Sequence, residues 1–398
     1  MKRAVRAFAA LGLAQAMACT APGLVRADDS KPIKIGVVHP YSGPLALAGV
    51  DASDGFELYF DQTKNRAAGR DIVLIKEDDA ANPAQGLERT RRLVEREQVD
   101  LLAGMTSSAV AYAVRAYVVQ HQMPLVIMGS AGANDLTDKL GSPYIFRTSF
   151  ANRQLGAAFG EYACKTLGYK KVVLFASDFV TGQEQSNAFE DKYREAGCTP
   201  AGKVMVPLGT TDFAPFLSRA TENGADGTWA MFFSADAVAF VKQYEALGLK
   251  AKLPLIAPAG TVDPSGLPAM GRAAIGLTAP VNYLPSLDNE ANKRFVEAFR
   301  AKYGRTPGAT AASGYTAAIV IAKALESLKG DVSDRKRLLE ALQRVKADTP
   351  MGPFEFDDKR NVLLDFYVGT VREKDGAIAL EQGPKIITAM DQFGHTRN

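Results

Sequence analysis

The chain has 398 residues, of which 47% are hydrophobic and 23% are charged, and its formal net charge is +3. This length fits two domains of typical size, and the composition excludes a disordered, collagenous or coiled-coil protein. Residues 1–27 contain four basic residues and no acidic one, so without them the net charge falls from +3 to −1. The charge therefore gives no reason to expect nucleic acid as a partner.

The N-terminus has the pattern of a secretory signal peptide, which we assign to residues 1–27. Basic residues precede the apolar stretch 7–18, and Val-Arg-Ala at 25–27 has the small-x-small spacing of a signal peptidase site. The apolar stretch is too short to cross a bilayer. An alternative is lipoprotein processing at Cys19, which follows Ala-Met-Ala. Both routes predict export, and we expect a periplasmic protein.

From Ile33 onward, short apolar strands alternate with helical patterns. The predicted strands are Ile33–Val38, Ile72–Ile75, Leu101–Ala103 and Leu125–Met128, and the helices between them are Leu45–Asn65, Pro83–Glu97 and Ser108–Gln120. Fully apolar strands that alternate with helices are typical of a parallel sheet covered by helices on both faces.

The alternation starts again near Arg153, which predicts a second open α/β lobe. The predicted helices are Arg153–Leu167, Gln183–Ala196, Phe213–Asn223 and Ala235–Leu247, and the strands are Val172–Ala176, Gly202–Val206, Thr228–Phe233 and Leu253–Ala257. The chain therefore forms two successive Rossmann-like lobes, each an open parallel sheet, and not one long sheet.

After a strand at Ile275–Ala279 the pattern changes to helices, at Asn289–Tyr303, Ala309–Lys329 and Arg335–Val345, and then to a β-rich tail that begins at Phe354. Helices without intervening strands cannot form a third sheet, so we expect them to pack on the first lobe. The chain then crosses between the lobes several times, as a hinge requires. We assign 28–148 plus 280–366 to lobe 1, and 149–279 plus 367–398 to lobe 2.

The usual catalytic motifs are absent. The sequence has no phosphate-binding loop, no H-E-x-x-H and no G-x-S-x-G, and it contains three histidines. We therefore expect no cofactor, no metal and no enzyme activity. The alternative is a hydrolase in which Ser107 or Ser108 is the nucleophile, and His39 is the only histidine placed to act as its base.

Turns rich in small and hydroxyl residues follow three predicted strands of lobe 1. They are 39–49, which contains Tyr41, then Thr106–Ser108, and 128–136. In open α/β sheets, ligands bind at the carboxyl ends of the strands, where free helix N–H groups with nearby hydroxyls suit a carboxylate. The alternative for Ser107 and Ser108 is simple helix capping. Three such turns on one edge favour a binding site.

Lobe 2 has equivalent turns at 177–185, 232–236 and 257–263. Phe179 and Phe233 lie in two of them, where an aromatic ring can contact a ligand or belong to the core.

Cys164 and Cys198 are the two cysteines that remain after export. They can form a disulfide or stay as buried thiols.

The ordered motifs resemble the leucine/isoleucine/valine-binding protein family, the periplasmic solute-binding proteins of ABC importers. They are KIGVVHPYSGPLALAG, GMTSSAVAYAVRAYVVQHQMPLVIMGSAGANDLTD, PYIFRTSFANRQLGAA, KKVVLFASDFVTGQEQSNAFED and TPGATAASGYTAAIVIAKALE, and together they extend over almost all of the mature chain. The resemblance implies a type I periplasmic binding protein fold, in which three crossovers join two lobes that close on a ligand. It also implies an ABC permease in the inner membrane as the partner.

The resemblance places the ligand carboxylate against the turns after the third and fourth strands, here Ser107, Ser108, Ala131, Gly132 and Ala133. It places Thr181, Phe233, Ser234 and Thr310 on the other walls. Amino-acid binders of the family carry an acidic residue before the glycine of a later loop, where this chain has Ala259 before Gly260.

A buried ammonium group without a carboxylate partner costs several kcal/mol, so Ala259 argues against an amino acid as ligand. We expect a small carboxylate without an amine, such as an aromatic acid stacked on Tyr41, Phe179 or Phe233. Asp236 or Asp263 could replace the missing acid, which leaves a branched-chain or other amino acid as the alternative. A stand-alone ligand sensor is a further alternative. In each case we expect a monomer.

Overall fold

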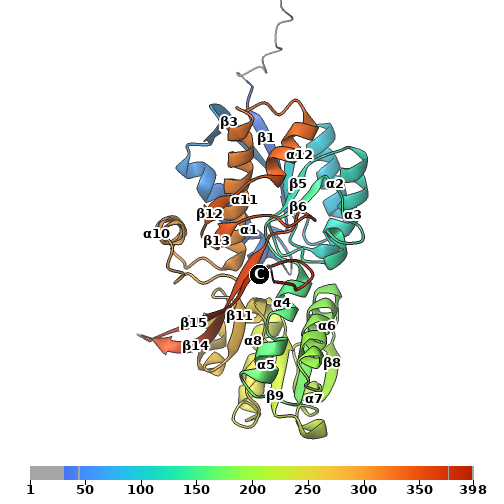
Figure 1. Ribbon diagram of the computed structural model, residues 1–398, viewed down its shortest axis with the longest axis vertical. Coiled ribbons are helices and arrows are strands. Elements are labelled where there is room, and N and C mark those ends of the chain that lie inside the picture. The colour runs from blue at the N-terminus through green and yellow to red at the C-terminus, as the bar shows by residue number, and fades with distance from the viewer. Residues whose placement is uncertain (1–30, 44, 375, 397–398) are drawn as a thin grey trace, which may run out of the picture.

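The computed structural model describes residues 31–43, 45–374 and 376–396. The predicted signal peptide, 1–27, and Cys19 lie outside the described residues. Two large sheets, each with its own helices, are stacked along the long axis of the molecule (Figure 1). The fold is thus mixed α/β with two lobes, as the sequence predicts.

The sheet of lobe 1 has six strands in the order β2-β3-β1-β4-β5-β6. All neighbours pair in parallel except β2, which is antiparallel to β3. The strands are β1 (Ile33–His39), β2 (Arg66–Ala67), β3 (Arg70–Asp78), β4 (Leu101–Gly104), β5 (Leu125–Ile127) and β6 (Ile145–Arg147). The helices between them are α1 (Ala46–Gln62), α2 (Pro83–Glu95) and α3 (Ser108–Gln120), with the short 3-10 helix η1 (Asn134–Leu136) before β6.

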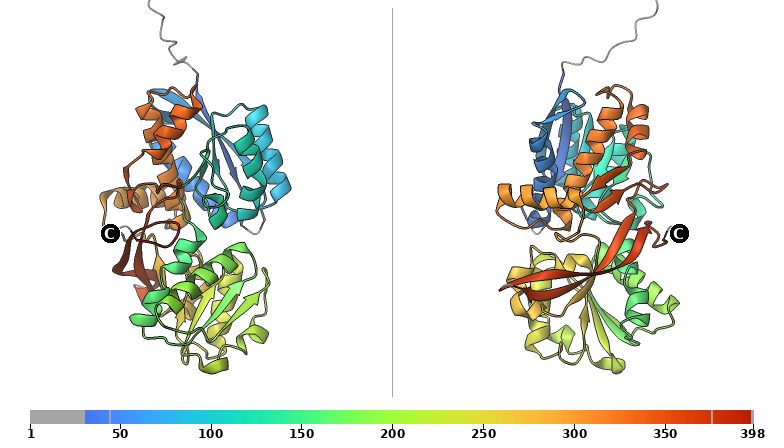
Figure 2. Two further views of the ribbon diagram at one scale, coloured as in Figure 1. Left: turned by 45° about the vertical axis from the view of Figure 1, so that its right-hand side comes forward. Right: turned by 60° about the vertical axis from the view of Figure 1, so that its left-hand side comes forward.

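The sheet of lobe 2 has seven strands in the order β15-β14-β11-β10-β9-β7-β8. The strands are β7 (Val172–Ser177), β8 (Gly202–Val206), β9 (Gly227–Met231), β10 (Leu255–Ile256), β11 (Thr278–Val281), β14 (Leu364–Lys374) and β15 (Ala377–Met390). Strands β7 to β11 pair in parallel, as predicted, whereas β14 and β15 form an antiparallel hairpin that pairs with β11. The right-hand view of Figure 2 shows this hairpin extending along the edge of the lobe to the junction between the lobes.

The helices of lobe 2 differ from the prediction in two places. The helix expected over 153–167 is two short helices, α4 (Asn152–Ala157) and α5 (Gly160–Lys165), and both pack on α6 (Val180–Glu195). The helix expected over 213–223 is only α7 (Ala214–Leu217) followed by the 3-10 turn η2 (Glu222–Gly224). The apolar spacing misled the prediction, because successive turns also bury Phe213, Leu217 and Ala220. The remaining elements of this region are α8 (Ser234–Ala246), η3 (Ala259–Val262), α9 (Leu267–Met270) and η4 (Gly271–Ala274).

The three helices after β11 are α10 (Glu290–Tyr303), α11 (Ala309–Ser327) and α12 (Arg335–Gln343), followed by the small hairpin β12 (Ala347–Thr349) and β13 (Gly352–Phe354). They pack on lobe 1, as predicted (Figure 1). The contact between α1 and α11 is very close. An added Cβ at Gly55 would lie 2.0 Å from the Ala311 carbonyl oxygen, and one at Gly314 would lie 2.0 Å from the Ala52 carbonyl oxygen.

The chain crosses between the two sheets at three places, from β6 to α4, from β11 to α10 and from β13 to β14. A buried polar network joins the first and third crossovers. The Arg147 guanidinium donates to the Asn361 side chain, and Gln154 Nε2 donates to the carbonyl oxygens of Val362 and Met390 at 3.0 and 2.8 Å. Because all these groups are buried, their hydrogen bonds fix the relative path of the two crossovers.

Cys164 and Cys198 are joined by a disulfide, which settles a pairing that the sequence leaves open. The bond ties α5 to the turn after α6 within lobe 2. Within the part of the chain that the structure describes, no helix is both long and apolar enough to cross a membrane.

We expect Gly314→Ala to lower the free energy of unfolding by about 1–3 kcal/mol, because the new methyl group would push α11 away from the α1 backbone. Denaturant unfolding of the two proteins measures the change. The matched control is Gly202→Ala in β8, where the added Cβ meets nothing closer than Asn223 Nδ2 at 4.0 Å. Equal losses in the two variants would contradict the close-packing explanation.

Candidate ligand-binding site

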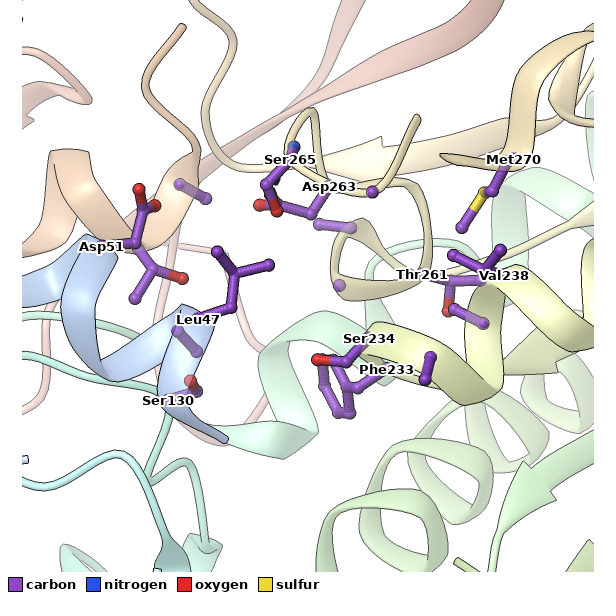
Figure 3. A pocket seen from close by; sticks show the side chains of 18 of the residues that line it. Leu47, Asp51, Ser130, Phe233, Ser234, Val238, Thr261, Asp263, Ser265 and Met270 are labelled. Carbon is purple, nitrogen blue, oxygen red and sulfur yellow. Dashed lines mark hydrogen bonds between the residues drawn. The ribbon is translucent and has the colours of Figure 1, made fainter. Parts of the chain in front are cut away.

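A cavity of about 280 Å³ lies between the lobes. Its wall from lobe 1, the crossovers and α11 consists of Leu47, Ala48, Asp51, Ser130, Phe150, Asn282, Ala309 and Thr310. Its wall from lobe 2 consists of Leu155, Phe233, Ser234, Ala235, Ala237, Val238, Ala259, Gly260, Thr261, Asp263, Ser265, Gly266, Ala269 and Met270. Figure 3 shows Leu47, Asp51 and Ser130 on one side, facing the labelled residues of lobe 2 across an open space.

Four of the residues predicted from the sequence line this cavity: Phe233, Ser234, Ala259 and Thr310. They come from the α8 start, from η3 and from the α11 start, which are distant in the sequence. The other predicted residues are not among the lining residues, namely Tyr41, Ser107, Ser108, Ala131, Gly132, Ala133, Phe179 and Thr181. Most of them have a definable structural role elsewhere in the lobes, as described below.

The two serines after β4 make hydrogen bonds within lobe 1. Ser107 Oγ accepts the Val110 N–H at 3.4 Å and so caps α3, while Ser108 Oγ accepts the Ala133 N–H at 3.2 Å. The turn that contains Ala131, Gly132 and Ala133 is therefore bound to the α3 N-terminus. Its preceding residue, Ser130, is the one that reaches the cavity.

Arg147 also binds the turn that contains Ala131, Gly132 and Ala133. Its guanidinium donates to the carbonyl oxygens of Ala131 and Ala133, at 3.4 and 2.8 Å, and to the Thr137 hydroxyl. Burial lowers the pKa of Arg147 to about 10, so the group remains charged at neutral pH. A fully buried cation with several carbonyl acceptors holds this turn in one conformation.

Tyr41, Phe179 and Thr181 lie near the cleft without lining the cavity. Tyr41 Oη is 2.8 Å from Ser53 Oγ, which fixes the phenol against α1. Phe179 packs edge-on against Phe233, with ring centroids 6.4 Å apart, and so supports a residue that does line the cavity. Thr181 is buried in the first turn of α6.

Three long helices begin at the cavity wall, which is the main electrostatic feature of the site. Leu47 and Ala48 belong to the first turn of α1, Ser234 and Ala235 to that of α8, and Ala309 and Thr310 to that of α11. No N-cap side chain accepts a hydrogen bond from any of these three helices. The Ala46 N–H bonds to the Gly43 carbonyl oxygen and the Ala311 N–H to Asp51. The remaining first-turn N–H groups and the N-terminal ends of the helix dipoles make this part of the cavity favourable for an anion.

Two carboxylates also lie in the wall, Asp51 and Asp263. Asp51 forms an ion pair with Arg305 and accepts the Ala311 N–H at 3.2 Å. Burial, with the nearby Asp263 charge as a second cause, raises the pKa of Asp51 to about 6. Asp263 instead accepts the N–H and the hydroxyl of Ser265, at 3.0 and 2.6 Å.

Asp236, the other acid considered from the sequence, does not line the cavity. Its carboxylate accepts the Gly209 N–H at 2.9 Å.

Several wall residues were missed from the sequence. Leu47 and Asp51 could have been found, because Leu47 lies in the predicted turn 39–49 and Asp51 follows it four residues later on α1. Phe150 and Asn282 carry no such signal, since they lie in crossovers that only the folded chain brings to the cavity.

His39 lies outside the cavity and is fully buried. Its Nδ1 is 2.9 Å from Thr106 Oγ1, and neither Ser107 nor Ser108 contacts its ring. Burial lowers the pKa of His39 to about 3, so the ring is neutral over the physiological range. The hydrolase alternative therefore lacks its base. Within the described residues, no cluster of histidine, cysteine or acidic side chains is arranged to hold a metal ion.

Comparison with known proteins agrees with this architecture. Residues 32–377 match the family described as periplasmic binding protein. The chain belongs to this family. Leu/Ile/Val-binding protein homolog 6 of Brucella suis biovar 1 is 32% identical to it over 350 residues, which cover 86% of this chain and 88% of that protein.

Solved structures give the same result. An ABC transporter substrate-binding protein from Sphaerobacter thermophilus is 38% identical, with a TM-score of 0.88 over 92% of this chain and 100% of that one. A solute-binding protein of an ABC transporter from Rhodopseudomonas palustris, in complex with 3,4-dihydroxybenzoic acid, is 29% identical, with a TM-score of 0.85 over 92% of this chain and 99% of that one.

This periplasmic binding protein is therefore the substrate-binding protein of an ABC transporter and not an enzyme. Proteins of this kind are exported, bind a small molecule between their lobes and work with a membrane permease. The two-lobed fold and the cavity between the lobes match that role.

The buried neutral His39 predicts an acid-dependent loss of stability. The unfolded chain binds a proton at His39 near its ordinary pKa of 6.5, whereas the folded protein does not until about pH 3. The free energy of unfolding should therefore fall as the pH falls below 6.5, by about 1.4 kcal/mol per pH unit from this group. His39→Asn keeps a polar atom near Thr106 but does not titrate. Its free energy of unfolding should therefore lack this part of the pH dependence. Denaturant unfolding between pH 7.5 and 4 tests it, and parallel curves for the two proteins would contradict it.

Proposed function

We propose that this protein captures a small carboxylate, with an aromatic acid as the best fit, between its two lobes and delivers it to an ABC permease. The observation that carries the proposal is the meeting of the α1, α8 and α11 N-termini at one cavity. The Ser130, Ser234 and Thr310 hydroxyls lie among these N-termini and add donors. Neutral donors of this kind bind a carboxylate well in a water-poor site.

The rest of the wall favours a ring over a polar molecule. Phe150, Phe233, Leu47, Val238 and Met270 supply aromatic and aliphatic surface. A cavity of about 280 Å³ is at the small end of ligand sites, which suits a compact molecule. The R. palustris relative described above, which binds a dihydroxybenzoic acid, supports the same ligand class.

The position of Ala259 gives independent support. It lies in the wall at the start of η3, where an acidic side chain would face the ligand. A methyl group there leaves no charge to pair with an ammonium group and none to repel a carboxylate.

We propose that the domains are 28–148 plus 280–366 and 149–279 plus 367–398, and that they close on the ligand. The exposed fraction of Leu47 is 50% although the residue lines the cavity, so closure has apolar surface left to bury.

In the closed form we expect the predicted ligand-binding residues Tyr41, Phe179 and Thr181 to approach the ligand. Ser107, Ser108, Ala131, Gly132 and Ala133 complete the carboxylate cradle behind Ser130. A monomer suffices, because one chain supplies both walls.

A second candidate is an α-amino acid, and Asp263 is the observation that favours it. Its carboxylate lies in the wall beside Gly308, the N-cap of α11, and forms no ion pair within the described residues. An ammonium group could bind to Asp263 while the ligand carboxylate binds at the helix N-termini.

Asp263→Asn separates the two ligand classes. If the ligand is an aromatic acid, the variant should bind benzoate as tightly as the wild type or more tightly, because a like charge is removed. If the ligand is an amino acid, leucine affinity should fall by about 10–100-fold. Titration calorimetry with both compounds measures this, and Asp236→Asn, off the wall, is the matched control. Absence of binding by any carboxylate would refute the proposed function.

Ala259→Glu should weaken binding of an aromatic acid by at least about tenfold relative to Ala259→Gln, because the two side chains have similar volume and only glutamate adds a negative charge. Dissociation constants of both variants for the same acid give the comparison. Equal affinities would mean that Ala259 does not face the carboxylate ligand.

A further inference from the structure

A second, much smaller cavity of about 10 Å³ adjoins the main one. It shares Phe150, Asn282, Ala309 and Thr310 with the main cavity. Its remaining wall is made by Met128, Gly129, Ser149 and Ser313. The volume corresponds to a single oxygen-sized group, about that of one water molecule. We call this space the satellite cavity.

Two hydroxyls of the satellite cavity have no hydrogen-bond partner. Ser149 and Ser313 are 1% and 3% exposed, and neither Oγ atom is paired within the described part of the chain. Ser149 lies in the first crossover and Ser313 on α11, so the folded chain brings them together from distant segments. Buried hydroxyls are almost always paired, so two orphans beside one small space indicate a group that is bound there.

The backbone at Gly129, in the wall of the satellite cavity, packs closely against the end of β4. An added Cβ at Gly129 would lie 2.7 Å from the Met105 carbonyl oxygen and 2.8 Å from Thr106 Oγ1. Any larger residue at position 129 would therefore collide with the β4 end or displace it. Asn282, which is also buried and lies in both cavities, adds an amide that can donate or accept.

We propose that the satellite cavity binds a hydroxyl group of the ligand, so that the ligand is a hydroxylated carboxylic acid. The inference rests on the proposed function, since the carboxylate must first bind at the helix N-termini. A hydroxyl group both donates and accepts, so it can pair with both serine hydroxyls at once. A site built to bind a hydroxyl discriminates strongly against the analogue that lacks it, because its own polar groups are then left unpaired.

The experiment compares benzoate with the three monohydroxybenzoates by titration calorimetry on the mature protein. At least one hydroxylated isomer should bind the wild type more tightly than benzoate by about tenfold or more. Ser313→Ala should reduce this preference to less than about threefold while changing the affinity for benzoate less than twofold. Ser149→Ala should also reduce the preference for the hydroxylated isomer over benzoate. The melting temperature of each unliganded variant checks that it is folded, and loss of an unpaired hydroxyl should not lower it.

Ser130→Ala is the matched control, because Ser130 lines only the main cavity. Ser130→Ala should lower the affinity for benzoate and the affinity for the hydroxylated acid by the same factor. If all isomers bind like benzoate, or if Ser313→Ala leaves the preference intact, the satellite cavity holds only a water molecule and the inference is overturned. If no acid binds at all, the proposed function fails instead, so the two failures are distinguishable.

Discussion

The buried guanidinium of Arg147 is the constraint on which the architecture between the lobes depends. A cation removed from water must have its donors paired, and here the acceptors come from the turn after β5, from Thr137 and from Asn361. These groups belong to one face of lobe 1 and to the third crossover. The same side chain therefore shapes the turn that presents Ser130 and fixes the path by which the chain returns to lobe 2. Replacement of Arg147 by a shorter residue would remove the donor from the carbonyl oxygens of Ala131 and Ala133 and from Asn361 Oδ1.

The electrostatics of the cavity follow from where helices begin and not from basic side chains. Among the described residues, no lysine or arginine lines the cavity, yet three helix N-termini do. Partial charges fixed in the backbone need no side-chain ordering when a ligand binds. Asp51 offsets part of the α11 N-terminus, because its carboxylate accepts the Ala311 N–H, and Arg305 balances the charge of Asp51. Asp263 lies in the wall without an ion pair among the residues that the structure describes, and its carboxylate accepts from Ser265 instead.

Much of the fold was predictable because its signals are local. The alternation of apolar strands with helices is repeated in both sheets, and the prediction that the late helices pack on lobe 1 is confirmed. The prediction failed where local pattern and tertiary packing compete. Phe213, Leu217 and Ala220 have helical spacing but occupy successive turns, and the helix expected from Arg153 is divided in two where it packs on α6. Strand β6 was missed because three residues are too few to give a period.

The sequence by itself determined the class of the protein, the two-lobed α/β plan and four residues of the cavity wall, Phe233, Ser234, Ala259 and Thr310. The two-lobed plan, Phe233 and Ser234 follow from strand ends and helix starts, which short segments encode. The class, Ala259 and Thr310 follow from the resemblance to the leucine/isoleucine/valine-binding protein family. Only the tertiary structure decided that Ser107 and Ser108 are bonded within lobe 1, that Ser130 presents the turn to the cavity, and that Phe150, Asn282, Ser149 and Ser313 meet beside it. The reason is physical: those residues lie in crossovers and on a returning helix, and no local pattern records which distant segment a crossover will meet.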